Sequence, residues 1–210
     1  MSDASQILKE PWPSVSRQRE GAAVGIWVFL ASEVLFFGAL MVSYAVYRTL
    51  YPAAFEAASH ETDILYGTIN TALLLTSSFI MTIALHASQM RLRRLLVICL
   101  LLTAAFGIAF LVVKGLEYAE DLDKHLLPGP HFGLSPPATE LFFALYWVMT
   151  GVHAIHLAVG IIIVLILATA IERESVVPDS PAVEPVALYW HFVDTVWIIL
   201  FALIYLPGRA

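Results

Sequence analysis

The chain has 210 residues, of which 60% are hydrophobic and only 13% are charged, and its mean hydropathy is +0.81. A water-soluble domain carries about 25% charged residues, so this composition excludes a soluble protein and indicates a membrane protein. The net charge of −6 gives no support to nucleic-acid binding, and a single cysteine, Cys99, excludes a disulfide scaffold. The partners are therefore expected to be lipids or other membrane proteins.

Five apolar stretches are long enough to cross a bilayer as helices, because about 20 helical residues span about 30 Å of hydrocarbon. These stretches are continuously apolar, which excludes the alternating pattern of a membrane β-barrel. We predict an all-α integral membrane bundle of five transmembrane helices over residues 24–208, preceded by a polar tail, residues 1–23. The predicted spans lie near 24–47, 64–87, 94–117, 140–170 and 186–207.

Lysine and arginine residues are distributed unequally between the two ends of these spans. Positive charges stay on the cytoplasmic side, so the tail is predicted to be cytoplasmic and the C-terminus periplasmic. The loop after the third span, which carries Glu120, Asp121 and Asp123, is then periplasmic, and it is too rich in proline for a helix. Arg48, Lys124 and Arg209 lie at this end, whereas the cytoplasmic end has Lys9, Arg17, Arg19, Arg91, Arg93, Arg94 and Arg173.

Glu33 lies about ten residues into the first span, or roughly 15 Å at the rise of a helix, which places it near the middle of the bilayer. An isolated carboxylate is costly at that depth, so the side chain is expected to be protonated. Two interpretations remain open. Glu33 is either a carboxylic acid that relays protons or contacts lipid, or a neutral acid bonded to a backbone carbonyl or a neighbouring helix.

The fourth span contains TGVHAIHLAVG, in which His153 and His156 lie on adjacent rows of one helix face. Paired histidines can bind haem or copper, with His191 and His86 as the other histidines within spans. We favour interhelical hydrogen bonds over metal ligation, because this spacing is not one of the common metal-binding patterns. Gly160, in the same segment, is small enough to let a neighbouring helix approach closely.

Other polar residues are predicted to join the helices to one another. His191 and Asp194, three residues apart in the fifth span, are close enough to interact directly. Lys114 and Glu117 have the same spacing at the outer end of the third span, where Lys114 can also reach toward the membrane surface. Asn70 belongs to a thin polar seam in the second span, and such seams usually serve helix packing.

Several motifs together resemble the signature segments of subunit III of haem–copper oxidases. They are, in chain order, SEVLFF, INTALLLTSS, GLEY, TGVHAIHLAVG and YWHFVDTVWIILFALIYL. The resemblance extends from about residue 24 to 208, and it is closest to the five-span bacterial form of the family. It implies a multi-pass protein of the bacterial inner membrane.

The resemblance also implies a role without redox chemistry in this chain. In the family, haem and copper belong to partner subunits, so this chain is expected to bind neither, and to pack directly on subunit I, with subunit II and small subunits also in the complex. Glu33 matches the carboxylate that reacts with carbodiimide. The first two spans are expected to diverge from the other three and form a V-shaped cleft filled by phospholipids. The subunit would support proton uptake and protect the catalytic centre during turnover.

The parent complex is predicted to be a proton-pumping cytochrome c oxidase of aerobic respiration, with this chain as an accessory subunit. A quinol oxidase or a nitric-oxide-reductase-associated homologue is the near alternative, because the choice of electron donor resides in other subunits. A free-standing membrane haem protein or proton carrier built on the histidines is an alternative of a different class.

Overall fold

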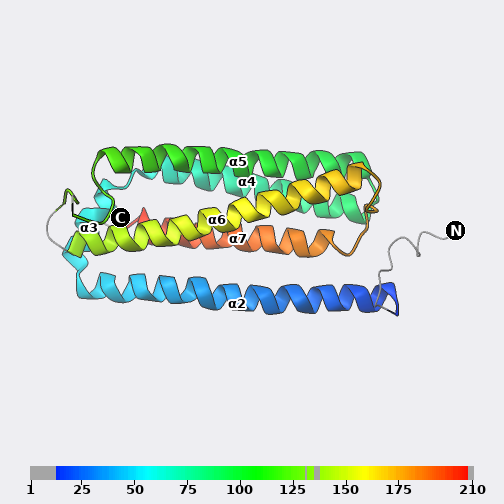
Figure 1. Ribbon diagram of the computed structural model, residues 1–210, viewed down its shortest axis with the longest axis horizontal. Coiled ribbons are helices and arrows are strands. Elements are labelled where there is room, and N and C mark those ends of the chain that lie inside the picture. The colour runs from blue at the N-terminus through cyan, green and yellow to red at the C-terminus, as the bar shows by residue number, and fades with distance from the viewer. Residues whose placement is uncertain (1–12, 131, 135–137, 208–210) are drawn as a thin grey trace.

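The computed structural model describes residues 13–130, 132–134 and 138–207. These residues form six α-helices and no β-strand. Figure 1 shows five long helices lying roughly parallel, with the short helix α3 connecting α2 to α4 at one end. The helices are α2 (Val15–Leu50), α3 (Pro52–Glu61), α4 (Ile64–Gln89), α5 (Arg93–Asp123), α6 (Ala138–Glu172) and α7 (Val183–Ile204).

Five of the six helices are long and apolar enough to cross a membrane, which confirms the predicted five-span, all-α architecture. Two boundaries differ from the prediction. Helix α2 begins at Val15, so the predicted tail is already helical from that residue, while residues 1–12 lie outside the described part of the chain. Helix α5 continues to Asp123, so the acidic residues that we assigned to a loop form its last turns.

The helix starts follow local chemistry in the sequence. The Ser14 hydroxyl accepts a hydrogen bond from the backbone N–H of Arg17 at the start of α2, and Asp63 caps α4 through the N–H of Leu65, at 2.8 Å. Pro52 occupies the first turn of α3, where its missing N–H costs nothing. Between these starts the apolar runs are helical because a helix satisfies its own backbone groups in hydrocarbon.

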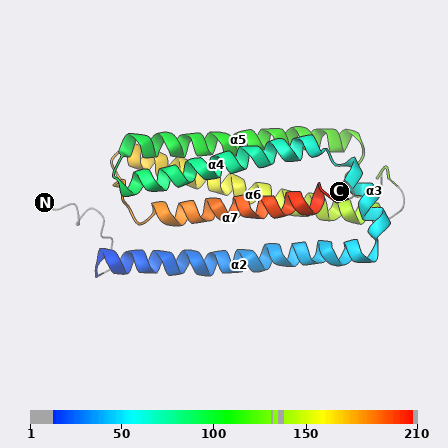
Figure 2. The same cartoon turned by 180° about the vertical axis from the view of Figure 1, so that it is seen from behind.

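Helices α4, α5, α6 and α7 form a closely packed bundle, and α2 lies along one side of it in contact with α6 and α7 (Figures 1 and 2). Half of the residues in the most apolar stretch of α7 are buried, against 11% in α2. The hydrophobic core therefore sits within the four-helix bundle, and α2 is a peripheral helix that exposes most of its apolar surface.

We expected the first two spans to diverge together from the other three and form a cleft, and this expectation is wrong. Helix α4 packs extensively on α5 and α7, whereas α2 stands apart from it, so these two spans do not diverge together from the other three. The physical reason is a close α4–α7 contact. A Cβ on Gly67 would lie 2.9 Å from side-chain atoms of Phe201 and Tyr205, and the Trp197 indole donates to the hydroxyl of Thr71.

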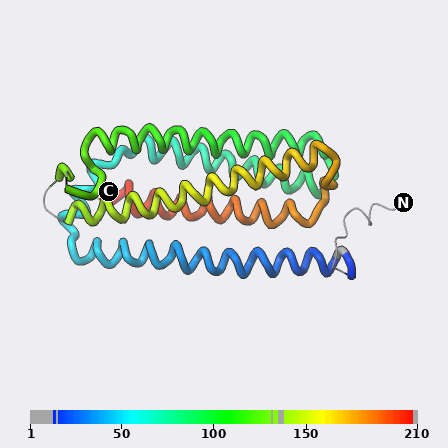
Figure 3. Tube along the Cα trace, in the orientation of Figure 1, coloured from blue at the N-terminus to red at the C-terminus, as the bar shows by residue number. Residues whose placement is uncertain are grey.

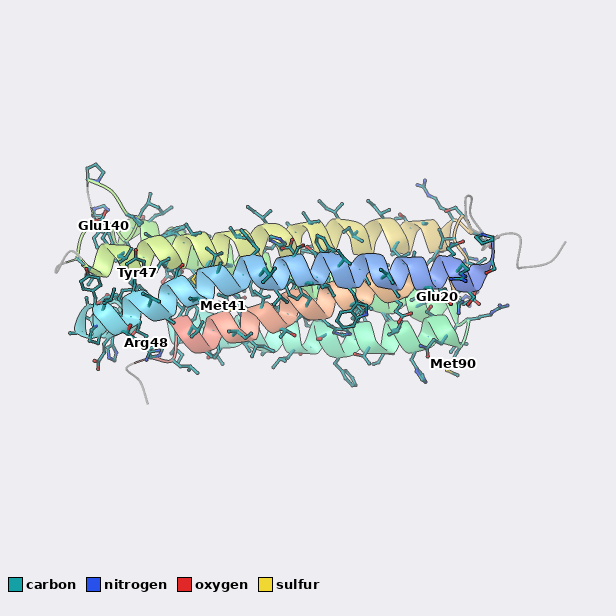
Figure 4. The ribbon with its side chains drawn as sticks, turned by 90° about the horizontal axis from the view of Figure 1, so that it is seen from below. Glu20, Met41, Tyr47, Arg48, Met90 and Glu140 are labelled. Atoms are coloured by element: carbon teal, nitrogen blue, oxygen red, sulfur yellow. The ribbon has the colours of Figure 1, made fainter. Side chains whose placement is uncertain are left out.

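The predicted basic residues gather at one end of the bundle. Arg19 at the start of α2 donates to the backbone oxygen of Asp179, and Arg91 between α4 and α5 forms a 3.0 Å ion pair with the same residue. The chain in Figure 3 begins α2 at this end and finishes α7 at the other. Figure 4 accordingly shows Glu20 and Met90 at one end and Arg48 and Glu140 at the opposite end. That the basic end faces the cytoplasm stays a prediction.

Candidate functional site

Glu33 lies on the face of α2 that contacts α6, and its Oε2 is 3.0 Å from Nε2 of His156. The two side chains are 16% and 21% exposed, so neither is fully enclosed. Glu33 therefore has a polar partner on the neighbouring helix, a contact of the kind that the second of our two interpretations describes.

The hydrogen bonds of His156 define what this contact can be. Its Nδ1 lies 2.8 Å from the backbone oxygen of Val152, and a carbonyl only accepts, so Nδ1 carries a hydrogen. Nε2 then either accepts a hydrogen from a protonated Glu33 or carries a second one as imidazolium. In both forms a single proton is shared between the carboxyl group and the imidazole. We call this the Glu33–His156 pair.

Aromatic rings surround the Glu33–His156 pair on the bundle side. The ring of Phe37, which is buried, lies edge-on to the His156 ring with centroids 5.1 Å apart. The Tyr189 hydroxyl from α7 donates to the backbone oxygen of His156 at 2.9 Å. These contacts fix the position of the imidazole and place apolar rings on the side of the pair that faces the bundle. The opposite side of the pair is partly exposed.

His153 and His156 do not form one site, although they are three residues apart. His153 is 0% exposed and points into the four-helix bundle, where its ring lies 5.5 Å from Phe110 and 5.1 Å from Trp197. Neither ring nitrogen of His153 has a hydrogen-bond partner among the described residues, and the same holds for the side-chain amide of Asn70. The interhelical hydrogen bonds that we expected from His153 and Asn70 are therefore not formed.

The predicted contact between His191 and Asp194 is also absent. His191 instead pairs through Nδ1 with the hydroxyl of Ser78 on α4, at 2.7 Å. Asp194 is 3% exposed and faces the interior of the bundle. The difference arises because α4 packs directly on α7 and offers a hydroxyl at the depth of His191, so an interhelical partner replaces the one within the helix.

A second group of ionisable residues lies inside the bundle at the end that carries α3. Lys114 does not reach toward the membrane surface as we expected. Its side chain is 2% exposed, and its Nζ lies 3.0 Å from Oε2 of Glu117. Aromatic rings enclose the ammonium, with the ring centroids of Tyr146 and Tyr118 at 4.6 and 4.9 Å. A buried charge of this kind is tolerated because it has both an anion and π-faces around it.

Two tyrosines connect this ion pair to a second acid. Nζ of Lys114 lies 2.7 Å from the hydroxyl of Tyr205 and 3.0 Å from that of Tyr146. Both hydroxyls contact Oε1 of Glu117, at 2.5 Å from Tyr205 and 3.0 Å from Tyr146. The Tyr146 hydroxyl is also 2.7 Å from Oδ2 of Asp121, which is 4% exposed. We call Lys114, Glu117, Asp121, Tyr146 and Tyr205 the lysine cluster.

The sequence reasoning missed three members of the lysine cluster, which are Asp121, Tyr146 and Tyr205. A signal for Asp121 was present, since positions 114, 117 and 121 are three and four residues apart and share one helix face. We instead assigned Asp121 to a loop, because the segment that follows it is rich in proline. No comparable spacing identifies the tyrosines, because they come from α6 and from the residue that follows α7.

No group of three or more histidine, cysteine, aspartate or glutamate side chains gathers in a metal-binding arrangement within the described ranges. His153, His156 and His191 each face a different neighbour, namely the aromatic core, α2 and α4. The ionisable side chains that the structure brings together form two groups. The Glu33–His156 pair shares one proton at the boundary of α2, and the lysine cluster joins α5, α6 and α7.

Comparison with known proteins agrees with this geometry. Residues 14–209 match the family described as cytochrome c oxidase subunit III. The chain is 34% identical over 188 residues to cytochrome c oxidase subunit 3 of a Synechocystis strain, a match that covers 87% of this chain and 74% of the relative. It is 33% identical to the protein of that name from Thermostichus vulcanus, over 89% of this chain and 87% of the relative.

A third relative has a different electron donor in its name. The chain is 27% identical to a probable quinol oxidase subunit 3 of Staphylococcus aureus, over 92% of this chain and 93% of the relative. Both kinds of relative are third subunits of oxidases, and the family match covers nearly the whole chain. The chain therefore belongs to the cytochrome c oxidase subunit III family.

Proposed function

We propose that this chain is the accessory subunit III, without a redox centre of its own, of a proton-pumping haem–copper terminal oxidase, and that the oxidase takes electrons from cytochrome c. The observation that carries the proposal is the family match over residues 14–209. The relatives named cytochrome c oxidase subunit 3 are 33–34% identical, against 27% for the probable quinol oxidase subunit, which favours cytochrome c as the donor.

In this complex the chain packs on subunit I in the bacterial inner membrane, with its N-terminus in the cytoplasm. The concentration of arginines at the end where α2 begins supports this orientation, since Arg19, Arg91 and Arg93 all lie there. Haem and copper belong to the partner subunits. The separate positions of His153, His156 and His191 support a chain that ligates neither.

The Glu33–His156 pair supports a role in proton uptake. A carboxyl group and an imidazole 3.0 Å apart share one proton, and both are partly exposed at the edge of α2. Transfer of this proton between the two groups leaves the net charge of the pair unchanged, so it creates no uncompensated buried charge. Glu33 is accordingly the carboxyl group expected to react with carbodiimide, because this reagent attacks protonated acids in apolar surroundings.

Phospholipids are proposed to cover the exposed surface of α2. A cavity of about 580 Å³ lies where α2, α3 and the end of α7 meet, and Arg48 is one of the residues that line it. An arginine at the end of a span can pair with a lipid phosphate while the acyl chains lie along the apolar helix. The remaining lining residues are Tyr44, Ala45, Thr49, Pro52, Glu56, Leu203 and Pro207.

The test is purification of the tagged chain from its native membrane in mild detergent, followed by oxygen consumption of the recovered complex. We expect a large haem-bearing subunit to accompany the chain and the complex to oxidise reduced cytochrome c. Oxidation of a quinol but not of cytochrome c would identify the alternative, a quinol oxidase, to which the Staphylococcus aureus relative points. Recovery without any haem-bearing partner would contradict the proposal.

A further inference from the structure

The lysine cluster has more close oxygen contacts than its hydrogens can serve if both acids are ionised. Nζ of Lys114 donates to the hydroxyls of Tyr146 and Tyr205, and it lies 3.0 Å from Oε2 of Glu117 as an ion pair. The tyrosine oxygens each accept one of these bonds, so every remaining contact in the cluster needs a hydrogen from a tyrosine or from a carboxyl group.

The two tyrosines supply one hydrogen each. The Tyr205 hydroxyl donates to Oε1 of Glu117 at 2.5 Å, which uses its only hydrogen. The Tyr146 hydroxyl has two acidic neighbours, Oε1 of Glu117 at 3.0 Å and Oδ2 of Asp121 at 2.7 Å. One hydrogen cannot serve both contacts. With both acids ionised, one pair of oxygens would face each other at hydrogen-bond distance with no hydrogen between them.

One further proton removes the conflict, and the geometry assigns it to Asp121. Glu117 is the acid in direct contact with the Lys114 ammonium and with both tyrosine hydroxyls, so it is the acid that is stabilised as an anion. We propose that Asp121 is a binding site for one proton, in which the carboxyl O–H donates to the oxygen of Tyr146 and the Tyr146 hydroxyl donates to Glu117. Every contact is then satisfied and the cluster is electrically neutral.

The charged and titratable groups around Asp121 come from each neighbouring element. Lys114 and Glu117 lie on the same helix, Tyr146 on α6, and Tyr205 after α7. Lys124, at the exposed end of α5, adds a positive field. On α4, Tyr66 donates to Glu120.

Release of the proton reverses the hydrogen bond between Asp121 and Tyr146 and ends the one from Tyr146 to Glu117. The O–H bond of Asp121 breaks, its electron pair stays on the carboxylate, and the proton leaves to water at the end of α5. The Tyr146 hydrogen then turns from Glu117 to Asp121. Glu117 keeps its contacts with Lys114 and Tyr205, so the site can empty and refill without opening the bundle. This inference concerns the chain itself and does not depend on which oxidase it serves.

Two matched substitutions test the assignment in the purified complex. Asp121→Asn replaces the neutral acid with an amide whose N–H₂ donates to Tyr146 in the same way, so we expect an unchanged thermal transition at neutral pH. Glu117→Gln removes the anion of Lys114 and is expected to reduce the recovery of folded complex strongly. The reverse order of the two effects would overturn the proposal.

Infrared spectroscopy of the Asp121→Asn protein keeps the test decisive even if Glu117→Gln does not fold. The wild-type complex is expected to show a protonated-carboxyl band that shifts in D₂O, disappears at alkaline pH and is lost in Asp121→Asn. Asp123→Asn, at an exposed position two residues along the same helix, is the control and should keep the band. A wild-type band that Asp121→Asn leaves unchanged would show that Asp121 holds no proton.

Discussion

The Glu33–His156 pair and the lysine cluster both place acids within the membrane-spanning helices, but they differ in how completely their surroundings satisfy them. Among the described residues one side chain, that of His156, bonds to Glu33, and only 11% of the most apolar stretch of α2 is buried. Glu117 contacts one ammonium and two hydroxyls and is 2% exposed. The comparison indicates that a single partner at a loosely packed boundary leaves Glu33 open to its surroundings, whereas several partners inside the bundle hold Glu117 as an anion and join three helices around it.

Removing the cation of the lysine cluster is expected to have the largest effect. Lys114→Met leaves Glu117 as a buried acid without its ammonium, and breaking a buried ion pair in this way costs about 3–5 kcal/mol. We expect a large loss of folded complex, measured by recovery in mild detergent and by the thermal transition. Lys114→Met combined with Glu117→Gln should recover part of the loss, since neither charge is then left unpaired. A single variant as stable as the wild type would contradict the role of the cluster in joining the helices.

The sequence predicts the five spans because length and hydrophobicity alone decide whether a segment can cross the membrane. It does not predict which side chains meet. His153 and His156 are about 60° apart around their helix, and this rotation sends one to the aromatic core and the other to α2. The partner of His191 and the helical state of Asp121 likewise depend on how α4 and α6 pack, which a pattern along one chain does not contain.

Gly160 tests the packing within the four-helix bundle. A Cβ at this position would lie 3.2 Å from the ring of Tyr189 and 3.4 Å from that of Trp190, so the larger side chain of Gly160→Leu must push α6 away from α7. Overpacking of this kind costs about 1–3 kcal/mol. Gly115→Leu is the control, because a Cβ there meets nothing within 4 Å. Equal recovery of both variants would show that the contact between α6 and α7 accommodates a leucine side chain at position 160.

At the Glu33–His156 pair, Glu33→Gln is expected to abolish carbodiimide labelling without impairing assembly of the complex. The amide can still bond to Nε2 of His156, so the effect on stability should be within about 1 kcal/mol. Carbodiimide labelling of the chain, followed by peptide mapping, should be lost. Glu20→Gln, on the same helix but exposed, is the control and should leave labelling intact. Labelling that persists in Glu33→Gln would assign the reactive acid elsewhere.

Ser78→Ala is expected to have the smallest effect. It removes the hydroxyl that pairs with Nδ1 of His191, and interhelical hydrogen bonds in membranes contribute about 0.6 kcal/mol on average. The thermal transition of the complex should therefore move only slightly. A loss as large as that of Lys114→Met would mean that the α4–α7 contact depends on this one bond.

The most direct test of the function is the visible spectrum of the chain after it has been separated from its co-purified partners. If the acids and imidazoles of this subunit bind protons and join neighbouring helices, the isolated polypeptide has no Soret band. The haem absorbance then stays with the large subunit. A Soret band that follows the isolated chain in stoichiometric amount would contradict the account.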